Sequence, residues 1–191
     1  SEGPSGQPGA EGQLMEVLDD EAKVASAALR EAAPFRDLPE GLIERIAAMA
    51  RTVRLAPDER VYAAGQSADS LYVVVSGRID HVFKREVGAR EAMKRIGPGG
   101  VFGWAGLLLG QTGRLATANA TEPSVLLSIP TEELVKLLES DPVEGKAAMD
   151  RFGRMIQTEF TMPSLLAQVR RLSGTPMTEE MSRLSLTMYR I

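Results

Sequence analysis

The sequence predicts an α+β fold in which a compact β-sandwich or barrel lies between two helical parts. Three observations lead to this prediction. Residues 13–50 carry apolar positions at helical spacing, and helical spacing returns at Thr131. Between them, residues 51–130 form short β-prone runs divided by turns rich in glycine and proline. About eight such runs in roughly 80 residues are enough to close a sandwich or barrel.

Two helices are predicted before the β-region. The segment 13–33 is rich in Ala, Leu and Glu, which favour helix. Its expected inward stripe, interrupted by the acids at 19–21, consists of Leu14, Val17, Leu18, Val24, Ala28 and Leu29. A second, shorter helix begins near Pro39 and buries Leu42, Ile43, Ile46 and Met49. Residues 1–12 carry neither pattern and are expected to form a disordered leader.

Within the β-region, individual strands can be assigned. Residues 71–75 are nearly all apolar, which indicates a strand buried on both faces. Ser76 and Gly77 end this strand, and a half-buried partner follows in which Ile79, His81 and Phe83 alternate inward. Two further strands are expected at 115–120 and 124–129.

Residues 131–172 are predicted to form C-terminal helices, and 173–191 a weakly patterned tail. Thr131 is expected to cap a helix that stops at Asp141–Pro142. A longer helix over 143–161 carries a wide apolar stripe of Phe152, Met155, Ile156 and Phe160. This stripe favours a homodimer or another protein partner through residues 143–161. Its alternative is packing of the stripe on the chain's own β-domain.

Composition excludes several kinds of function. The 22 basic and 26 acidic residues give a net charge of −4, so nothing attracts the whole chain to nucleic acid. The absence of cysteine excludes disulfides, thiolate catalysis and cysteine metal sites. His81 is the only histidine and is interpreted as a strand residue, so no metal site is expected. We expect a cytoplasmic, non-enzymatic protein, because no nucleophile–base pair, carboxylate cluster or membrane span stands out.

The segment 101–118, "VFGWAGLLLGQTGRLATA", has the features of an anion site. It holds glycines at 103, 106, 110 and 113, one arginine and no acid. Glycines allow backbone N–H groups to approach an anion closely. Arg114 adds a permanent charge and a planar set of donors that suits a phosphate group.

The order of these motifs identifies a family resemblance. The stretches "RVYAAGQSADSLYVVVSGRIDHV" and "IGPGGVFG", followed by Phe102, Gly103, Leu107, Arg114, Ala116 and Thr117, match the family's strands and phosphate-binding cassette. Over residues 35–160 the chain therefore resembles the cyclic-nucleotide-binding domain of the catabolite activator protein, of regulatory subunits of cyclic-nucleotide-dependent kinases, and of gated channels. The resemblance implies an antiparallel double-stranded β-helix (a jelly-roll-like β-roll) between N- and C-terminal helices.

The same resemblance implies a ligand and its contacts. The ligand would be a cyclic nucleotide, cyclic AMP or cyclic GMP, and the residues themselves call for no other cofactor. The implied ligand-binding residues are Phe102, Gly103, Trp104, Ala105, Gly106, Leu107, Arg114, Leu115, Ala116 and Thr117. In the family, ligand entry moves the cassette against the C-terminal helix.

Residue 104 departs from the family pattern. The family has an acid there that accepts a hydrogen bond from the ribose 2′-hydroxyl, and this chain has Trp104. An indole donates one hydrogen bond and accepts none, so it cannot replace the acid. Two interpretations remain open: the indole stacks on the base or sugar of an unusual ligand, or it fills the pocket.

Three functions follow from these observations. The first is a sensor or regulatory module that binds a cyclic nucleotide or related anion in the cassette at 102–117 and relays binding through its C-terminal helix. The second is a degenerate, ligand-free domain that acts as a scaffold or subunit of a larger assembly. The third is a transcription factor, which needs a helix-turn-helix after the long helix. The roughly 30 residues after Thr161 are too few and too weakly patterned for one, so no DNA binding by this chain alone is expected.

Overall fold

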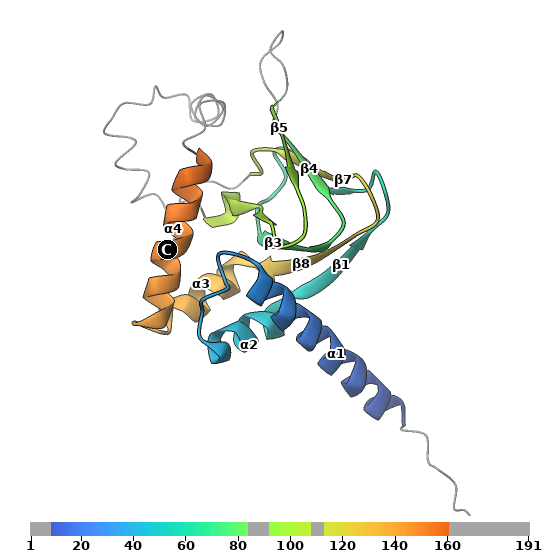
Figure 1. Cartoon of the computed structure of the whole chain (residues 1–191), viewed down its shortest axis with the longest axis vertical. Coiled ribbons are helices and arrows are strands. Elements are labelled where there is room, and N and C mark those ends of the chain that lie inside the picture. Colours follow the sequence, from blue (N-terminus) through green and yellow to red (C-terminus); the bar gives the residue numbers. More distant parts are fainter. Residues whose placement is uncertain (1–8, 84–91, 108–112, 161–191) are drawn as a thin grey trace, which may run out of the picture.

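The computed structural model describes residues 9–83, 92–107 and 113–160. Over these residues the chain has two helices, a β-domain, and two further helices (Figure 1). The helices are α1 (Ala10–Glu31), α2 (Glu40–Met49), α3 (Thr131–Glu139) and α4 (Glu144–Phe160). The strands are β1 (Arg51–Leu55), β2 (Arg60–Tyr62), β3 (Ser70–Ser76), β4 (Ile79–Phe83), β5 (Ala92–Ile96), β6 (Val101–Phe102), β7 (Thr117–Ala120) and β8 (Ser124–Pro130). A short 3₁₀ helix, η1 (Trp104–Leu107), follows β6.

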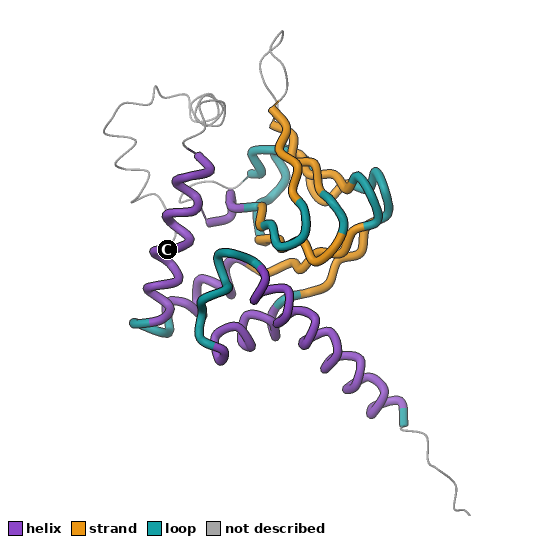
Figure 2. Tube along the Cα trace, viewed as in Figure 1, coloured by secondary structure: helices purple, strands orange, loops and turns teal. Residues whose placement is uncertain are grey.

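The strands form two antiparallel four-stranded sheets. Their orders are β1-β8-β3-β6 and β2-β7-β4-β5, so consecutive strands alternate between the sheets as in a jelly roll, except that β4 and β5 pair within one sheet. The sheets curl around a shared interior, with the helices gathered beside one of them (Figure 2). The predicted α+β fold and its β-roll are confirmed. The alternation along β4 is also confirmed, because Ile79, His81 and Phe83 are buried and the residues between them are half-buried.

Two hydrophobic clusters hold the described part of the chain together. The first, here called the helical cluster, joins the helices to the β1-β8-β3-β6 sheet and includes Leu29, Phe35, Ile46, Leu127 and Phe152. The second, the lumen cluster, fills the inside of the roll and includes Tyr62, Val74, Ile79, Phe102 and Leu126. The described part of the cassette contributes to both clusters, with Trp104 and Leu107 in the helical cluster and Phe102 in the lumen cluster.

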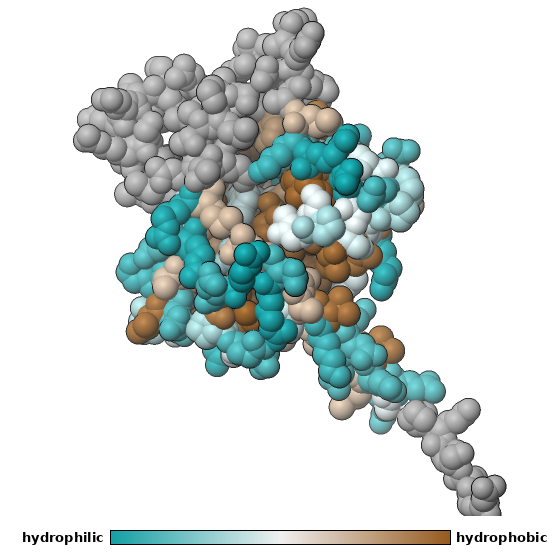
Figure 3. Space-filling model, in the orientation of Figure 1, coloured by the Kyte–Doolittle hydropathy of each residue, from teal (hydrophilic) through white to brown (hydrophobic). Residues whose placement is uncertain are grey.

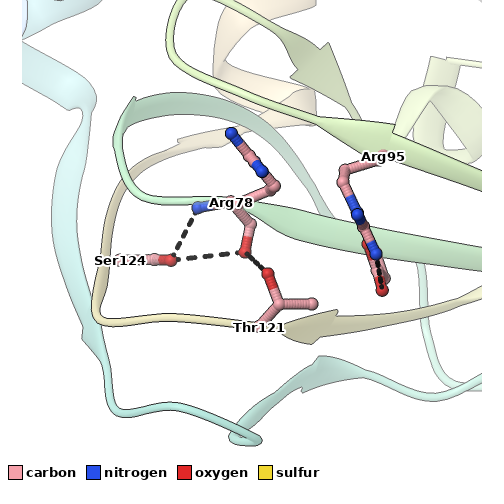
Figure 4. Close-up of polar contacts among 5 residues, drawn as sticks. Arg78, Arg95, Thr121 and Ser124 are labelled. Carbon is pink, nitrogen blue, oxygen red and sulfur yellow. Dashed lines mark hydrogen bonds and ion pairs between the residues drawn. The ribbon is translucent and has the colours of Figure 1, made fainter.

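Polar contacts tie the β3–β4 turn to the β7–β8 turn (Figure 4). The N–H of Arg78 donates to Oγ of Ser124 at 3.1 Å, and the Thr121 hydroxyl donates to the Arg78 carbonyl at 3.3 Å. On the neighbouring strand, Nε of Arg95 donates to Oδ1 of Asp80 at 2.9 Å. These contacts fasten one end of the roll and lie away from the cassette.

The expected inward stripe of the first helix is wrong over its first half. Leu14, Val17, Leu18 and Val24 are 47 to 61% exposed, and burial begins only at Ala25. The reason is visible in Figure 1, where α1 projects beyond the body and only its C-terminal half lies against α2 and the sheet. Helical periodicity reports which residues share a face, but not how far along the helix a partner extends.

The start of the C-terminal helices also differs from expectation. Thr131 is the first helical residue of α3, Pro130 holds the N-cap position, and no side chain caps that end. A side-chain cap occurs instead at α4, where Oδ1 of Asp141 accepts hydrogen bonds from the N–H groups of Glu144 at 2.9 Å and Val143 at 3.1 Å. Both bonds lower the pKa of Asp141, and the bond from Glu144 has the larger effect.

The apolar stripe of α4 faces the chain's own domain. Phe152 and Ile156 are fully buried in the helical cluster, which agrees with the alternative interpretation of this stripe. Pairing of two copies through 143–161 stays a prediction, and residues 161–191 lie outside the described part of the chain. Among the described helices, none has the length and apolar character that crossing a membrane requires.

Candidate functional site: a buried arginine in the cassette

Arg114 is the centre of the candidate site and is only 3% exposed. Its Nη1 donates to the Gly103 carbonyl at 3.0 Å and its Nη2 to the Ser70 carbonyl at 2.8 Å. Its backbone is held as well, because its N–H donates to Gln66 and its carbonyl accepts from Gly65. The arginine thus connects the start of β3 to the beginning of the cassette.

Aromatic rings cover the guanidinium from the lumen. Its central carbon lies 4.2 Å from the ring centre of Tyr62 and 5.5 Å from that of Tyr72. Cation–π attraction of this kind strengthens when the cation is withdrawn from water. The Tyr62 ring thereby stabilises the charge and fixes the plane of the guanidinium.

The charge of Arg114 is incompletely compensated. The carboxylate of Asp69 lies 4.0 Å from Nη2 but is 80% exposed, so water screens much of its attraction. Among the described residues no carboxylate is buried, and the buried Nε of Arg114 has no hydrogen-bond partner. A buried cation with a free donor is costly unless an anion approaches it. Chemically, the arrangement therefore favours an anionic ligand.

Glycine is required at two cassette positions by close packing. Gly103 has φ +89°, and a Cβ there would lie 3.0 Å from Nη1 of Arg114 and 3.1 Å from the Ser70 carbonyl oxygen. At Gly106 a Cβ would lie 2.7 Å from the Ala68 carbonyl oxygen. Any side chain at 103 would therefore displace the arginine, which ties this glycine to the site.

The other sequence-predicted residues divide between the two clusters. Phe102 faces the lumen and stacks on Tyr72 with ring centres 5.2 Å apart. Leu107 belongs to the helical cluster. Ala105, Leu115 and Ala116 are buried as well, and the Thr117 hydroxyl accepts a hydrogen bond from the N–H of Ala64 at 3.0 Å. The structure thus brings Phe102, Gly103 and Arg114 together. Residues 108–112 lie outside its described part.

His81 completes the aromatic lining of the lumen. Its Nε2 lies 2.7 Å from the Tyr62 hydroxyl, and its ring meets Phe83 edge-on at 4.8 Å. Burial, followed by the positive charges of Lys94 and Arg114, lowers the pKa of His81 to about 4. The imidazole is therefore neutral at pH 7, and the position of His81 in β4 confirms its interpretation as a strand residue.

Trp104 points to the helical side of the cassette. The indole is 6% exposed, belongs to the helical cluster, and has its ring centre 6.0 Å from that of Phe152 on α4. Both interpretations drawn from the sequence placed this ring in the ligand pocket, whereas its observed ring contact is with α4. The position after Gly103 opens η1, and the turn of that 3₁₀ helix directs the side chain outward from the roll. With Met155, the indole lines an open groove of about 840 Å³ beside the turn at 97–100.

Sequence reasoning missed the residues that surround Arg114. Tyr62 and Tyr72 stand in predicted strands, but their meeting depends on pairings between distant strands. The register places Tyr62 opposite Ala118 and Tyr72 opposite Phe102. The signal available in the sequence was a tyrosine in each of two β-prone runs, because buried tyrosines usually serve a polar partner.

The family comparison agrees with this site. Residues 52–141 match the family model of the cyclic nucleotide-binding domain, which confirms the resemblance that the cassette and the preceding strands predicted. The matched segment contains β1 to β8, η1, α3 and Arg114.

Individual relatives match over part of their length. An uncharacterised NTE family protein of Mycobacterium tuberculosis is 26% identical over 150 residues, covering 78% of this chain and 24% of that protein. A voltage-gated delayed rectifier potassium channel of Homo sapiens is 35% identical over 108 residues, covering 55% of this chain and 10% of the channel. The chain thus spans about a quarter of the mycobacterial relative and less of the channel.

Solved structures share the fold. The regulatory subunit of a cAMP-independent protein kinase A from Trypanosoma brucei, in a triple mutant bound to cAMP, superposes with a TM-score of 0.63 at 13% identity. The similarity covers 83% of this chain and 54% of that one. At this identity the likeness concerns the fold alone.

Proposed function

We propose that this chain is a non-enzymatic regulatory module that binds a cyclic nucleotide or related anion in the cassette at 102–117. One observation carries the proposal: Arg114 is buried, its Nε has no partner among the described residues, and no buried carboxylate there balances its charge. A cyclic phosphate supplies an anionic oxygen acceptor for such a donor. The match to the cyclic nucleotide-binding family supports the same ligand class.

Ligand binding would change the partners of the guanidinium. Nη1 and Nη2 are engaged with the carbonyls of Gly103 and Ser70. A phosphate that takes a second donor has to replace one of these carbonyls. Release of the Gly103 carbonyl would free the start of η1, because Trp104 follows directly.

The relay to α4 would pass through Trp104. Its contact with Phe152 joins the cassette to the middle of α4 by direct side-chain packing. Movement of η1 therefore changes the packing of α4, whose stripe is already seated in the helical cluster. In this proposal Arg114 detects the anion, and the indole transmits the change.

The missing acid predicts an unusual preference for the sugar. Without the family's acceptor at 104, the ribose 2′-hydroxyl gains no hydrogen bond from this position. We therefore expect cyclic AMP and its 2′-deoxy analogue to bind within about threefold of each other. Binding to either should be weak, because an acceptor of this kind contributes roughly 1–3 kcal/mol.

A second function has its own observation. Both terminal nitrogens of Arg114 already donate to carbonyls, and its plane lies over Tyr62. This is the arrangement of a structural arginine that joins β3 to the cassette. A ligand-free domain that serves as a scaffold or subunit in a larger assembly would need nothing more from this residue.

Trp104 provides the test, because it is the single tryptophan of the chain. Its emission and the melting temperature are followed while cyclic AMP, cyclic GMP, cyclic CMP and 2′-deoxy cyclic AMP are added to millimolar concentration. The regulatory module predicts a saturable emission change and a raised melting temperature, since a ligand at 100 times Kd adds about 2.7 kcal/mol. Unchanged emission, unchanged melting and no heat in calorimetry would contradict the regulatory module and favour the scaffold.

A pair of variants locates the binding in the cassette. Arg114→Lys keeps the charge but loses the planar set of donors, so nucleotide affinity should fall at least about tenfold. Arg54→Lys, at an exposed position of β1, is the matched control and should bind as the parent does. Circular dichroism confirms that both variants are folded. Equal affinity of the two variants would place the ligand elsewhere.

A further inference from the structure

The first half of α1 is an exposed helix with an apolar face. All residues from 10 to 24 are exposed, whereas burial begins at Ala25. The large apolar residues of this half, each exposing 47 to 67% of its surface, are Leu14, Met15, Val17, Leu18 and Val24. In the described residues only Met93 and Val143 are comparably exposed. Met15 lies on the far side of the helix, whereas Leu14, Val17, Leu18 and Val24 share one side, and a group of this kind is typical of an interaction site.

This face continues the face that holds α1 to the body. Leu14, Leu18, Ala25 and Leu29 follow one another at spacings of four, seven and four residues, which place them on one side of a helix. Ala25 and Leu29 are buried in the helical cluster, and Leu14 and Leu18 extend the same line into solvent. Figures 1 and 3 show the projecting helix and the brown apolar atoms along it. One half of this face is thus packed on the body of the chain, and the other half, the exposed stripe, remains in solvent.

Acidic residues lie on and beside the stripe and define the partner's charge, and Glu21 falls on the same side of the helix as Leu14 and Leu18. Residues 10–24 contain one base, Lys23, and five acids: Glu11, Glu16, Asp19, Asp20 and Glu21. Glu16 and Asp20 stand four residues apart, where like charges repel and weaken a helix. None of the five acids forms an ion pair within the part of the chain that the structure describes. Cations supplied from outside would remove this repulsion.

We propose that the exposed stripe of α1 is a docking surface for a basic amphipathic helix of a partner protein. Such a helix buries its apolar side on Leu14, Leu18 and Val24 and sets its Lys or Arg residues against the flanking acids. A second copy of α1 fits poorly, because it would bring five further acids to the same surface. An anionic bilayer fits poorly for the same reason.

A synthetic probe tests both parts of this surface. A labelled 18-residue helix with leucines on one side and lysines on the other is titrated with the full chain at physiological salt, and its anisotropy is followed. The same peptide with glutamate in place of lysine is the charge control. We expect saturable binding of the lysine peptide and at least tenfold weaker binding of the glutamate peptide.

Three variants separate docking from attraction between charges alone. Leu18→Glu removes an apolar contact but adds a negative charge, so simple charge attraction predicts tighter binding. The docking surface predicts at least tenfold weaker binding. Val143→Glu makes the same change at an exposed residue outside α1 and should leave affinity unchanged. Glu21→Lys should weaken binding several-fold and flatten its salt dependence.

Three results would overturn the proposal. The first is unaltered or tighter peptide binding by Leu18→Glu. The second is self-association of the parent chain in sedimentation that Leu18→Glu abolishes, which assigns the stripe to a second copy. The third is binding of phosphatidylserine–phosphatidylcholine vesicles that Leu18→Glu abolishes, which assigns it to a lipid surface.

Discussion

At the scale of single residues, the buried side chains of Arg114 and His81 both contact Tyr62. Arg114 lies over the ring face of Tyr62, and His81 meets its hydroxyl at 2.7 Å. A protonated His81 would add a second positive charge to a region where one is already incompletely balanced. The lowered pKa of the imidazole follows from its burial first and from this neighbourhood second.

His81 gives a prediction about acid stability. Its pKa is lowered to about 4 in the folded chain, while an unfolded histidine has a pKa of about 6.5. Its contribution to stability is therefore complete above pH 6.5 and is lost as pH falls toward 4, because the unfolded state binds the proton first. By pH 4.5 the loss should reach roughly 2–3 kcal/mol. Urea unfolding at pH 7 and pH 4.5 measures it.

The control for this prediction is His81→Gln. Glutamine keeps a polar partner near the Tyr62 hydroxyl but does not titrate. On acidification the variant should lose less unfolding free energy than the parent. The loss that remains in both proteins comes from their carboxylates. Identical pH dependence of the parent and variant would contradict the assignment.

Residue chemistry was predictable where it depended on the side chain alone. Arg114 was singled out as the one cation of a glycine-rich, acid-free segment; the structure places it beside Gly103, and its anion-binding role stays a prediction. The direction of Trp104 was not predictable, because it depends on the turn of η1 and on the nearness of α4. The chemical argument that indole cannot replace a carboxylate still stands, although the ring lies on the other side of the cassette.

At the scale of elements, the junction of α3 and α4 is fixed by one glycine. Gly145 is buried at the start of α4, and a Cβ there would overlap the carbonyl of Leu138 near the end of α3. Asp141 caps α4 across the same junction. The angle between the two helices thus depends on the absence of a side chain at 145.

Gly145→Ala should destabilise the protein by about 1–3 kcal/mol, since the overlap is with backbone that cannot move aside. Gly41→Ala in α2 is the matched control, because no atom lies within 4 Å of its added Cβ. That change should be neutral or stabilising by up to about 1 kcal/mol, as alanine favours helix. Urea unfolding compares the two variants, and equal stability would refute the close approach.

Sequence periodicity predicted an element well where the elements packed beside it cover its whole length. The alternation of β4 and the buried run of β3 follow directly from strands packed in a roll. Helix α1 shows the limit of this reasoning. Its stripe was identified correctly as one face of a helix, but Leu14 and Leu18 lie beyond the end of its partner. The missing knowledge concerned tertiary contact, which local pattern does not contain.

At the scale of the whole molecule, the roll and the helices are joined through the cassette. Trp104 and Leu107 belong to the helical cluster, while Phe102 belongs to the lumen cluster. The contact between Trp104 and Phe152 should therefore report on the packing of α4 against the rest of the molecule.

Phe152→Leu tests this connection. A swap of this size in a packed core should cost about 1–1.5 kcal/mol, and the loosened contact should shift the emission of Trp104 to longer wavelength. Phe35→Leu removes a ring from the same cluster, 5.2 Å from Phe152, and serves as the control of similar cost. Its emission should stay closer to that of the parent. Equal spectral shifts in the two variants would mean that the indole senses general loosening only.

The two-sided cassette has a consequence for how such a protein can diverge. Substitutions at Tyr62, Tyr72 or Arg114 change the lumen, whereas substitutions at Trp104 or Phe152 change the seat of α4. Because these two sets share no residue, we expect that the lumen and the seat of α4 can change in separate mutational steps. A lineage can in this way change the lumen while the packing of α4 stays as it is, or change the packing of α4 while the lumen stays as it is.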